Sequence, residues 1–239
     1  MTSQSLLYRS TYEINKHISI MLPPVGDIID HEDEYYTLVF LLTAMPIDLM
    51  VQLDDIGIDF TKINEFELFT LLFGDIKEQD TSLIFGDLDL SKFELGINED
   101  NGLVCFIDTE NDIKIDRALY NDIANALRRI HHLEKDKRKP ANEEAKEYMI
   151  RRAREKLKRR KNRKHGSQLE PLITAMVNTE QYKYDFEGTR ELSIYQFNEC
   201  VRQIIKKVDY DNRMHGVYAG TISINDLSKD DLTWIQNNK

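Results

Sequence analysis

Cysteine is scarce in this chain, whose 239 residues include only Cys105 and Cys200, far apart and without the spacing of metal ligands. A disulfide framework is therefore not expected, and a reducing compartment suits the composition. Long apolar runs are also missing, because the longest, Leu38 to Met45, is far shorter than the ~20 residues that a membrane span needs. The first ten residues lack the charged-then-apolar pattern of a signal peptide. We expect a soluble intracellular protein with no membrane partner.

Motifs for catalysis or metal binding are equally scarce. The sequence contains no glycine-rich phosphate loop, no serine elbow and no zinc ribbon. Asp87 and Asp89 have the spacing of a metal-binding pair, but alternate residues of one strand would also simply share a solvent face. His131 and His132 are adjacent, so on a helix they point about 100° apart and do not easily share a metal. We therefore expect no enzyme, no cofactor and no metal site.

Charge is distributed unevenly along the chain, whose net charge is −10. Residues 1–115 hold 6 Lys and Arg against 23 Asp and Glu, a net charge of −17. Residues 116–165 hold 18 against 8, a net charge of +10, and residues 166–239 hold 8 against 11, a net charge of −3. This asymmetry predicts that the basic segment folds against the acidic half of the same chain or of a neighbour, or binds a polyanion. Asp54, Asp55 and Asp59 are part of that acidic half and do not match the spacing of an EF-hand loop.

The basic segment is centred on one long predicted helix, residues 142–164. Asn142 is a suitable N-cap, glutamates follow in the first turn, and Gly166 is a suitable stop. Its basic end contributes six candidate partner-binding residues: Arg151, Arg152, Lys156, Arg159, Arg160 and Arg163. Candidate apolar contacts come from its narrow apolar stripe and from a later helix: Met149, Leu157 and Phe197.

Whether this basic end binds nucleic acid or is only a solvated helix end stays open. A run of Lys and Arg suits an acidic partner or a phosphate backbone. However, no aromatic residue lies between Ile150 and Glu180, and surfaces that bind single strands usually combine positive charge with stacking rings.

Periodicity and turn chemistry predict an α+β fold: a mixed N-terminal body with a small antiparallel sheet, then a mainly helical second half with the long basic helix. We expect an acidic α+β domain at 1–115, helices with a charged linker at 116–165, and a small helical domain at 166–239. Strands are expected at 12–22, as short pieces within 82–95, and at 93–97, 103–108 and 112–115. Helices are expected at 35–45, at 47–53 after a break at Pro46, and at 64–73, 116–133, 168–177, 193–208 and 227–236. Residues 209–222 are expected to be rich in turns.

Several stretches resemble a family of tail-region proteins from tailed phages and prophages of Gram-positive bacteria. They are residues 47–73, from IDLMVQLDDIGIDF to FELFTLLF; 139–156, KPANEEAKEYMIRRAREK; 167–189, from SQLEPLITAM to YDFEGT; and 192–235, from LSIYQFNECVRQ to DDLTWI. The resemblance implies a tail-assembly chaperone or a minor tail component, with the tape measure protein as the suspected partner. It implies a location in the host bacterial cytoplasm, with the virion tail as the alternative, and it supplies no catalytic residues. The opposite charges of the two segments also make head-to-tail self-association physically reasonable.

Overall fold

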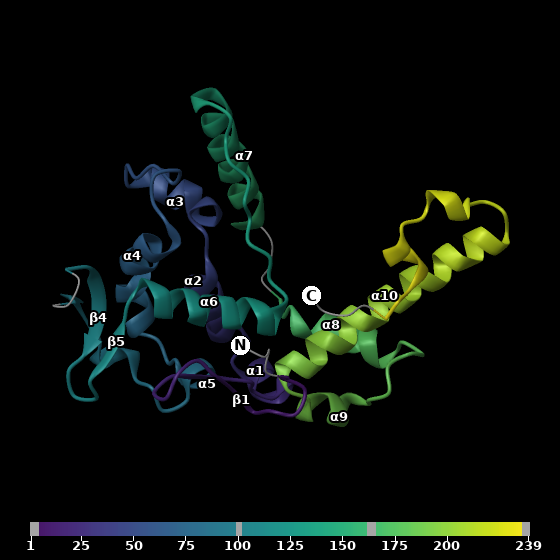
Figure 1. Ribbon diagram of the computed structural model, residues 1–239, viewed down its shortest axis with the longest axis horizontal. Helices are drawn as coiled ribbons and strands as arrows, with labels where there is room; N and C mark the ends of the chain where they lie inside the picture. The colour runs from purple at the N-terminus through teal and green to yellow at the C-terminus, as the bar shows by residue number, and fades with distance from the viewer. Residues whose placement is uncertain (1–4, 99–101, 162–165, 236–239) are drawn as a thin grey trace.

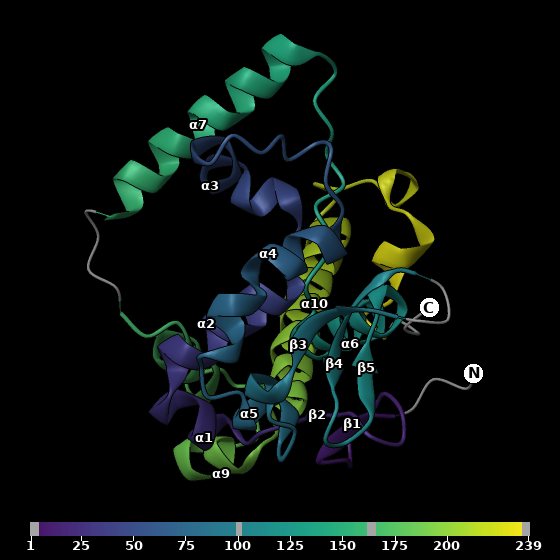
Figure 2. The same ribbon diagram turned by 90° about the vertical axis from the view of Figure 1, so that its left-hand side faces the viewer.

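The computed structural model describes residues 5–98, 102–161 and 166–235. It confirms the α+β fold: two small antiparallel sheets belong to the N-terminal half, and the second half is mainly helical (Figure 1 and Figure 2). The long basic helix and the last long helix both extend away from the central packing, in different directions (Figure 1).

The first sheet is a hairpin of β1 (Thr11–Glu13) and β2 (Ser19–Met21), followed by α1 (Val25–Asp30). The prediction of one continuous strand at 12–22 was wrong, because Asn15 starts a turn in the middle of it. Its side-chain oxygen accepts hydrogen bonds from the backbone N–H groups of His17 and Ile18, both at 2.8 Å. Asparagine side chains often stabilise turns in this way.

The predicted break at Pro46 is confirmed. Helix α2 (Glu32–Thr43) ends before it, and the chain continues as a 3-10 turn, η1 (Pro46–Leu49), and α3 (Met50–Asp55). Proline lacks an N–H donor and disfavours helical backbone in the residue before it, which explains the break. Gly57, with φ of +75°, then turns the chain after α3.

Helix α4 (Glu65–Lys77) also begins where the sequence predicted. The side chain of Asn64 accepts hydrogen bonds from the N–H groups of Phe66 at 3.0 Å and Glu67 at 3.1 Å. In return, the Glu67 carboxylate accepts a hydrogen bond from the N–H of Asn64 at 2.8 Å. This reciprocal capping satisfies donors that have no partner within the helix.

Of the short strands predicted within 82–95, those before residue 93 were wrong. This segment forms a short helix, α5 (Ser82–Phe85), and a 3-10 turn, η2 (Leu90–Lys92). Gly86, at φ of +62°, ends α5 in a conformation that other residues rarely adopt. Asp89 caps η2 by accepting the N–H of Ser91 at 2.9 Å, so local capping outweighs the strand-like pattern of this stretch.

The second sheet is the predicted meander, with order β3 (Glu94–Ile97), β4 (Val104–Asp108) and β5 (Ile113–Ile115). Phe106 of β4 stacks on Phe73 of α4 with ring centroids 3.9 Å apart. Phe69 of α4 stacks on Tyr120 of α6 (Arg117–His131) at 4.4 Å. These rings join the sheet to both helices, and offset or edge-to-face ring pairs add stability beyond the area that they bury.

The C-terminal part contains α8 (Leu169–Val177), α9 (Phe186–Glu191) and α10 (Ile194–Tyr218). The turns predicted at 209–222 were wrong for 209–218, because α10 continues ten residues beyond Val208, and were confirmed for 219–222. Ion pairs four residues apart support this extension: Lys207 with Asp211, and Asp209 with Arg213, each at 2.5 Å. The terminal helix predicted at 227–236 was also wrong for 227–235, where Ser228 starts a 3-10 turn, η4 (Lys229–Leu232). A similar turn, η3 (Ile224–Asp226), comes before it after Ser223, and residue 236 lies outside the described residues.

Two groups of buried apolar side chains hold the described chain together. The larger core joins both sheets to helices from both halves of the chain; its most buried large residues include Ile20, Leu38, Phe93, Phe106, Tyr120 and Phe197. The smaller core consists of Ala44, Ile47, Leu49, Leu53, Phe60 and Leu68. Because the larger core contains side chains from before residue 115 and after residue 166, those expected domain boundaries do not separate independent cores.

No single helix in the part of the chain that the structure describes has both the length and the apolar composition to cross a membrane. Helix α2 and the η1–α3 segment meet such a test only as a pair, and the pair is bent by 119°.

Candidate functional site

The long basic helix is α7 (Glu143–Lys161), and it lies across α3 at one end of the molecule (Figure 2). Asn142 caps it as predicted, accepting the N–H of Ala145 at 2.8 Å. Three residues spaced four apart, Lys146, Ile150 and Arg154, share the face that meets the acidic half of the chain. The predicted folding of the basic segment against the acidic half of the same chain is therefore confirmed for this face.

Ion pairs hold both halves of α7. Lys146 Nζ lies 3.0 Å from a carboxylate oxygen of Asp59. Two turns later, Arg154 forms a fork, with one nitrogen 2.8 Å from Asp54 and the other 2.6 Å from Asp55. The acidic residues around Gly57 thus bind the helix of the same chain, a use that their spacing did not indicate.

These contacts stabilise the charged forms of the groups involved. Hydrogen bonds from Thr61, and then from Lys146, hold the pKa of Asp59 well below its usual range. Hydrogen bonds to Glu143 and Asp59 raise the pKa of Lys146, and the contact with Asp55 raises that of Arg154. All of these ion pairs are exposed to solvent to some degree, so salt screens them, and the apolar seam beneath carries the rest of the docking.

That apolar seam is formed by Met149 and Ile150, which pack against the smaller core. Both side chains are half-buried. Their burial between α7 and α3 removes apolar surface from water, which is the main favourable contribution to such a contact.

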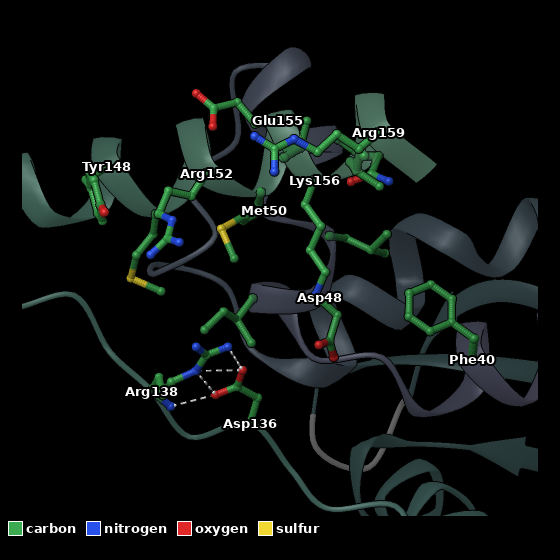
Figure 3. A pocket seen from close by; sticks show the side chains of 17 residues that line it. Phe40, Asp48, Met50, Asp136, Arg138, Tyr148, Arg152, Glu155, Lys156 and Arg159 are labelled. Atoms are coloured by element: carbon green, nitrogen blue, oxygen red, sulfur yellow. Dashed lines mark hydrogen bonds and ion pairs between the residues drawn. The ribbon is translucent and has the colours of Figure 1, made fainter. Parts of the chain in front are cut away.

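Next to the seam, α7 and the η1–α3 segment enclose an open groove of about 960 Å³ (Figure 3). Its apolar lining comes from α2, η1, α3 and α7: Phe40, Ile47, Leu49, Met50, Val51, Tyr148, Met149, Ala153 and Leu157. Its polar lining consists of Asp48, Gln52, Asp136, Arg138, Arg152, Glu155, Lys156 and Arg159. The volume lies at the upper end of the ~300–1,000 Å³ range of small-molecule clefts, and the groove is only partly enclosed, which leaves room for a peptide segment.

The charges of the two walls differ. The α7 wall presents Arg152, Lys156 and Arg159 around Glu155, and none of these three cations has an ion-pair partner among the described residues. On the opposite wall the acids are already engaged: the Asp48 carboxylate accepts the N–H of Met45 at 2.8 Å. There, Asp136 and Arg138 pair with each other, as the dashed lines in Figure 3 show. The groove therefore offers an apolar floor beside a wall of available positive charge.

The buried side chain of Arg128 connects the two ends of the segment that carries η1 and α3, residues 44–64. Arg128 of α6 donates from Nη2 to the carbonyl oxygen of Thr43, at the end of α2, at 2.6 Å. The same nitrogen lies 2.9 Å from Glu65, in the first turn of α4, and Lys135 lies 2.8 Å from the other Glu65 oxygen. Arg128 thus joins the two helix ends between which residues 44–64 leave the main body.

The structure places most of the predicted partner-binding residues on one helix. Arg151, Arg152, Lys156 and Arg159 are exposed on α7, and Leu157 and Met149 line the groove. Arg160 belongs to α7, and Arg163 lies outside the described residues. Phe197 is different: it is completely buried in the larger core, so the folded chain does not offer it to a partner.

Sequence reasoning missed the second wall of the groove. Phe40 and Met50 line it, and Arg154 fixes its geometry, yet none of them was a candidate. One signal was present, since three acids around Gly57 are the natural partners of a segment with net charge +10.

The described residues contain no group of three or more His, Cys, Asp or Glu side chains that could hold a metal ion. The aspartate pair considered earlier is exposed in a loop: Asp89 caps η2, and Asp87 lies between α5 and η2. His131 faces inward, where its Nε2 lies 3.0 Å from the hydroxyl of Tyr35, and its neighbour His132 lies 3.4 Å from Glu199.

Comparison with known proteins gives one finding. Residues 158–239 match the family model of the YomV second domain. No curated protein and no solved structure matches the chain. The matched part begins in the last turn of α7 and includes α8, α9, α10 and the two terminal 3-10 turns. This C-terminal third is therefore similar to a domain of a phage-associated family.

Proposed function

We propose that this protein assists phage tail assembly by binding other tail proteins, and that its principal client is the tape measure protein. The similarity of residues 158–239 to a phage-associated domain family supports a phage role. The resemblance of four stretches of the sequence to tail-region proteins supports the tail as the setting. In this proposal the protein acts by binding, without catalysis, in the cytoplasm of the host bacterium.

The groove between α7 and the η1–α3 segment is the observation that carries the proposal. An amphipathic helix binds such a surface by laying its apolar face on the floor, with its polar flank along the rim. A tape measure protein is rich in coiled coil, so before the tail is complete it exposes apolar seams of this kind. A groove with an apolar floor of Met50, Met149 and Leu157 suits such a seam, and methionine adapts to varied partners.

The charge of the α7 wall adds selectivity. Arg152, Lys156 and Arg159 favour a client helix whose flank is acidic. At an ionic strength of ~0.15 M the Debye length is about 8 Å, so these charges guide the approach of the client over a short range. Affinity comes mainly from burial of the apolar floor.

Pull-down from infected cells, together with mass spectrometry of purified particles, tests the function. A chaperone captures the tape measure protein from cells and is absent from particles. Stoichiometric presence in particles would instead indicate a minor structural tail component. No tail protein in either sample would contradict the proposal.

Matched variants of α7 test the role of the groove. Arg152→Glu with Lys156→Glu reverses charge on the groove wall, whereas Arg151→Glu with Lys158→Glu makes the same change outside the groove lining. All four positions are exposed, and glutamate is a good helix former, so α7 should persist in both. We expect the first pair to lose the client and the second to retain it. Equal capture by both variants would exclude the groove wall as the binding surface.

A nucleic-acid-binding role is the second candidate, and one observation favours it. Helix α7 exposes Arg151 and Arg152 beside the ring of Tyr148, with guanidinium carbons 5.4 Å and 5.7 Å from its centroid. Binding to DNA or RNA through the basic segment 151–164 should weaken steeply as salt rises, because phosphate contacts release counterions. It should also disappear when Arg159, Arg160, Lys161 and Arg163 are all changed to alanine. Absence of measurable binding at low salt would remove this candidate.

A further inference from the structure

The last part of the chain forms a projecting C-terminal arm, which we define as residues 205–235. The start of α10 is anchored in the larger core through Ile194, Tyr195 and Phe197, but the rest of the helix runs outward (Figure 1). Residues after Gly220 fold back along it, as Figure 1 shows for the yellow segment. Arg213 pairs with Asp231, and the Lys207 ammonium lies 5.9 Å from the ring centroid of Trp234.

The segment of this arm that folds back along α10, residues 224–235, is called its tip below and is both apolar and acidic. Ile224 and Ile235 expose 55% and 67% of their surface, and Leu232 is also exposed. Asp226 and Asp230 are exposed beside them, and neither has an ion-pair partner among the described residues. Exposed apolar side chains that are grouped on one projecting element indicate a contact surface.

The tip and the groove are complementary in chemistry. The groove offers an apolar floor beside Arg152, Lys156 and Arg159, and the tip offers apolar side chains beside two carboxylates; within the described part of the chain none of these charges has an ion-pair partner. The arm of one molecule leads away from its own α7, so the tip does not occupy the groove of the same chain (Figure 1). We propose that the tip of the C-terminal arm docks in the α7 groove of a second copy of this chain.

The symmetry of this contact follows from its two different surfaces. A groove that binds a tip is a head-to-tail contact, so each dimer retains one free groove and one free tip. Further copies add to these ends until a ring closes or the supply of chains ends. The contact is small, so the self-association is reversible and depends on concentration.

Sedimentation velocity of the purified full-length chain, over a range of concentrations, tests the proposal. We expect an average mass above the 28.1 kDa of one chain that rises with concentration. Raising NaCl from about 0.05 M to about 0.5 M should weaken the association, because the charges at the rim are exposed. Arg152→Glu with Lys156→Glu should weaken it at least ~10-fold, since attraction becomes repulsion. The matched pair Arg151→Glu and Lys158→Glu should leave it within about threefold.

A mixing experiment isolates the head-to-tail geometry. Asp226→Lys with Asp230→Lys reverses the charge of the tip, and its matched control is Asp75→Lys with Asp87→Lys, two exposed residues far from the arm in sequence. The groove variant and the tip variant should each be monomeric, yet a mixture should associate, with the two kinds of chain alternating. One contact uses the intact groove and the intact tip, and the next uses the two reversed surfaces, whose signs are exchanged. Combining both charge reversals in one chain should restore association by exchanging the signs.

Three outcomes would overturn the proposal: a wild-type chain that stays monomeric throughout, a control pair that weakens association as much as its test pair, or a mixture that stays monomeric. Circular dichroism of every variant separates lost association from lost folding. The tip variant also separates this proposal from the proposed function, because its groove is intact. It should still capture the tape measure protein from infected cells while it fails to self-associate, so either result can fail without the other.

Discussion

Replacement of the buried Arg128 by methionine should destabilise the protein by a calculable amount. Its side chain is only 7% exposed, and one of its nitrogens contacts both the Thr43 carbonyl and the Glu65 carboxylate. Removal of one partner from a buried ion pair typically costs ~3–5 kcal/mol, because the other charge is left without compensation. Here Glu65 retains Lys135 at 2.8 Å and is 19% exposed, so most of that penalty is avoided.

The remaining loss is that of the charge-assisted hydrogen bond to the Thr43 carbonyl. A hydrogen bond to a charged group contributes ~1.5–3 kcal/mol, and methionine keeps much of the packing of the arginine stem. We therefore expect Arg128→Met to lower the free energy of unfolding by about 2–3 kcal/mol. Urea unfolding, with an unchanged dependence on denaturant concentration, measures this directly.

Lys135 provides the decisive comparison. If it compensates Glu65, then Arg128→Met combined with Lys135→Met should cost more than the sum of the two single changes, because Glu65 then loses both cations. Arg117→Met, on the exposed first turn of the same helix, is the matched control and should change stability by less than about 0.5 kcal/mol. A cost below ~0.5 kcal/mol for Arg128→Met, or strict additivity in the double variant, would refute this account.

Three further predictions follow from other contacts. Burial lowers the pKa of His131 to about 4, so as pH falls this imidazole is protonated in the unfolded chain before it is protonated in the folded chain. The free energy of unfolding should therefore fall as pH decreases from about 6.5 to about 4, by on the order of 3 kcal/mol. His131→Gln should flatten much of that slope in urea unfolding measured at stepped pH, and an unchanged slope would contradict the assignment. Arg154→Met removes the fork to Asp54 and Asp55, so trypsin should cut the flanking segments 135–139 and 158–166 several-fold faster, whereas an unchanged rate would show that the apolar seam alone holds α7. Asn64→Ala removes the cap of α4 and should cost ~0.5–2 kcal/mol in thermal or urea unfolding; no loss would show that the cap is dispensable.

Elements with strong local signals were predictable from the sequence. The break at Pro46 follows from the covalent structure of proline, and the start of α4 follows from Asn64 and Glu67 at capping spacing. The meander of β3, β4 and β5 was marked by turn residues between short apolar runs. In each case the cause lies within a few residues of its effect.

Elements that depend on competing local signals were not predictable. Residues 82–92 alternate apolar and acidic side chains as a strand does, but Gly86 and the Asp89 cap direct them into helical turns. Residues 209–218 contain Gly216, which favours a turn. They nevertheless continue α10, because ion pairs run along the helix and the Ile222 side chain packs against that glycine. Here several weak preferences oppose each other, and packing decides between them.

One wall of the candidate groove could be predicted from the sequence, and the other could not. Charge alone identified α7 and most of its exposed cations, including Arg152, Lys156 and Arg159. The opposite wall was not identified, because Phe40 and Met50 lie about a hundred positions earlier in the chain. A groove between distant segments has no signature in either segment alone.

The attachment of α7 has a consequence for how the protein can diversify. This helix contacts the smaller core through one narrow seam and is otherwise held by partly exposed ion pairs. The larger core includes side chains of α6 and α8 but none of α7. Substitutions on its groove-facing side therefore leave the folding of the body nearly unaffected. Under the function proposed above, a change of client would need substitutions at only a few residues of α7, and the rest of the fold would be retained.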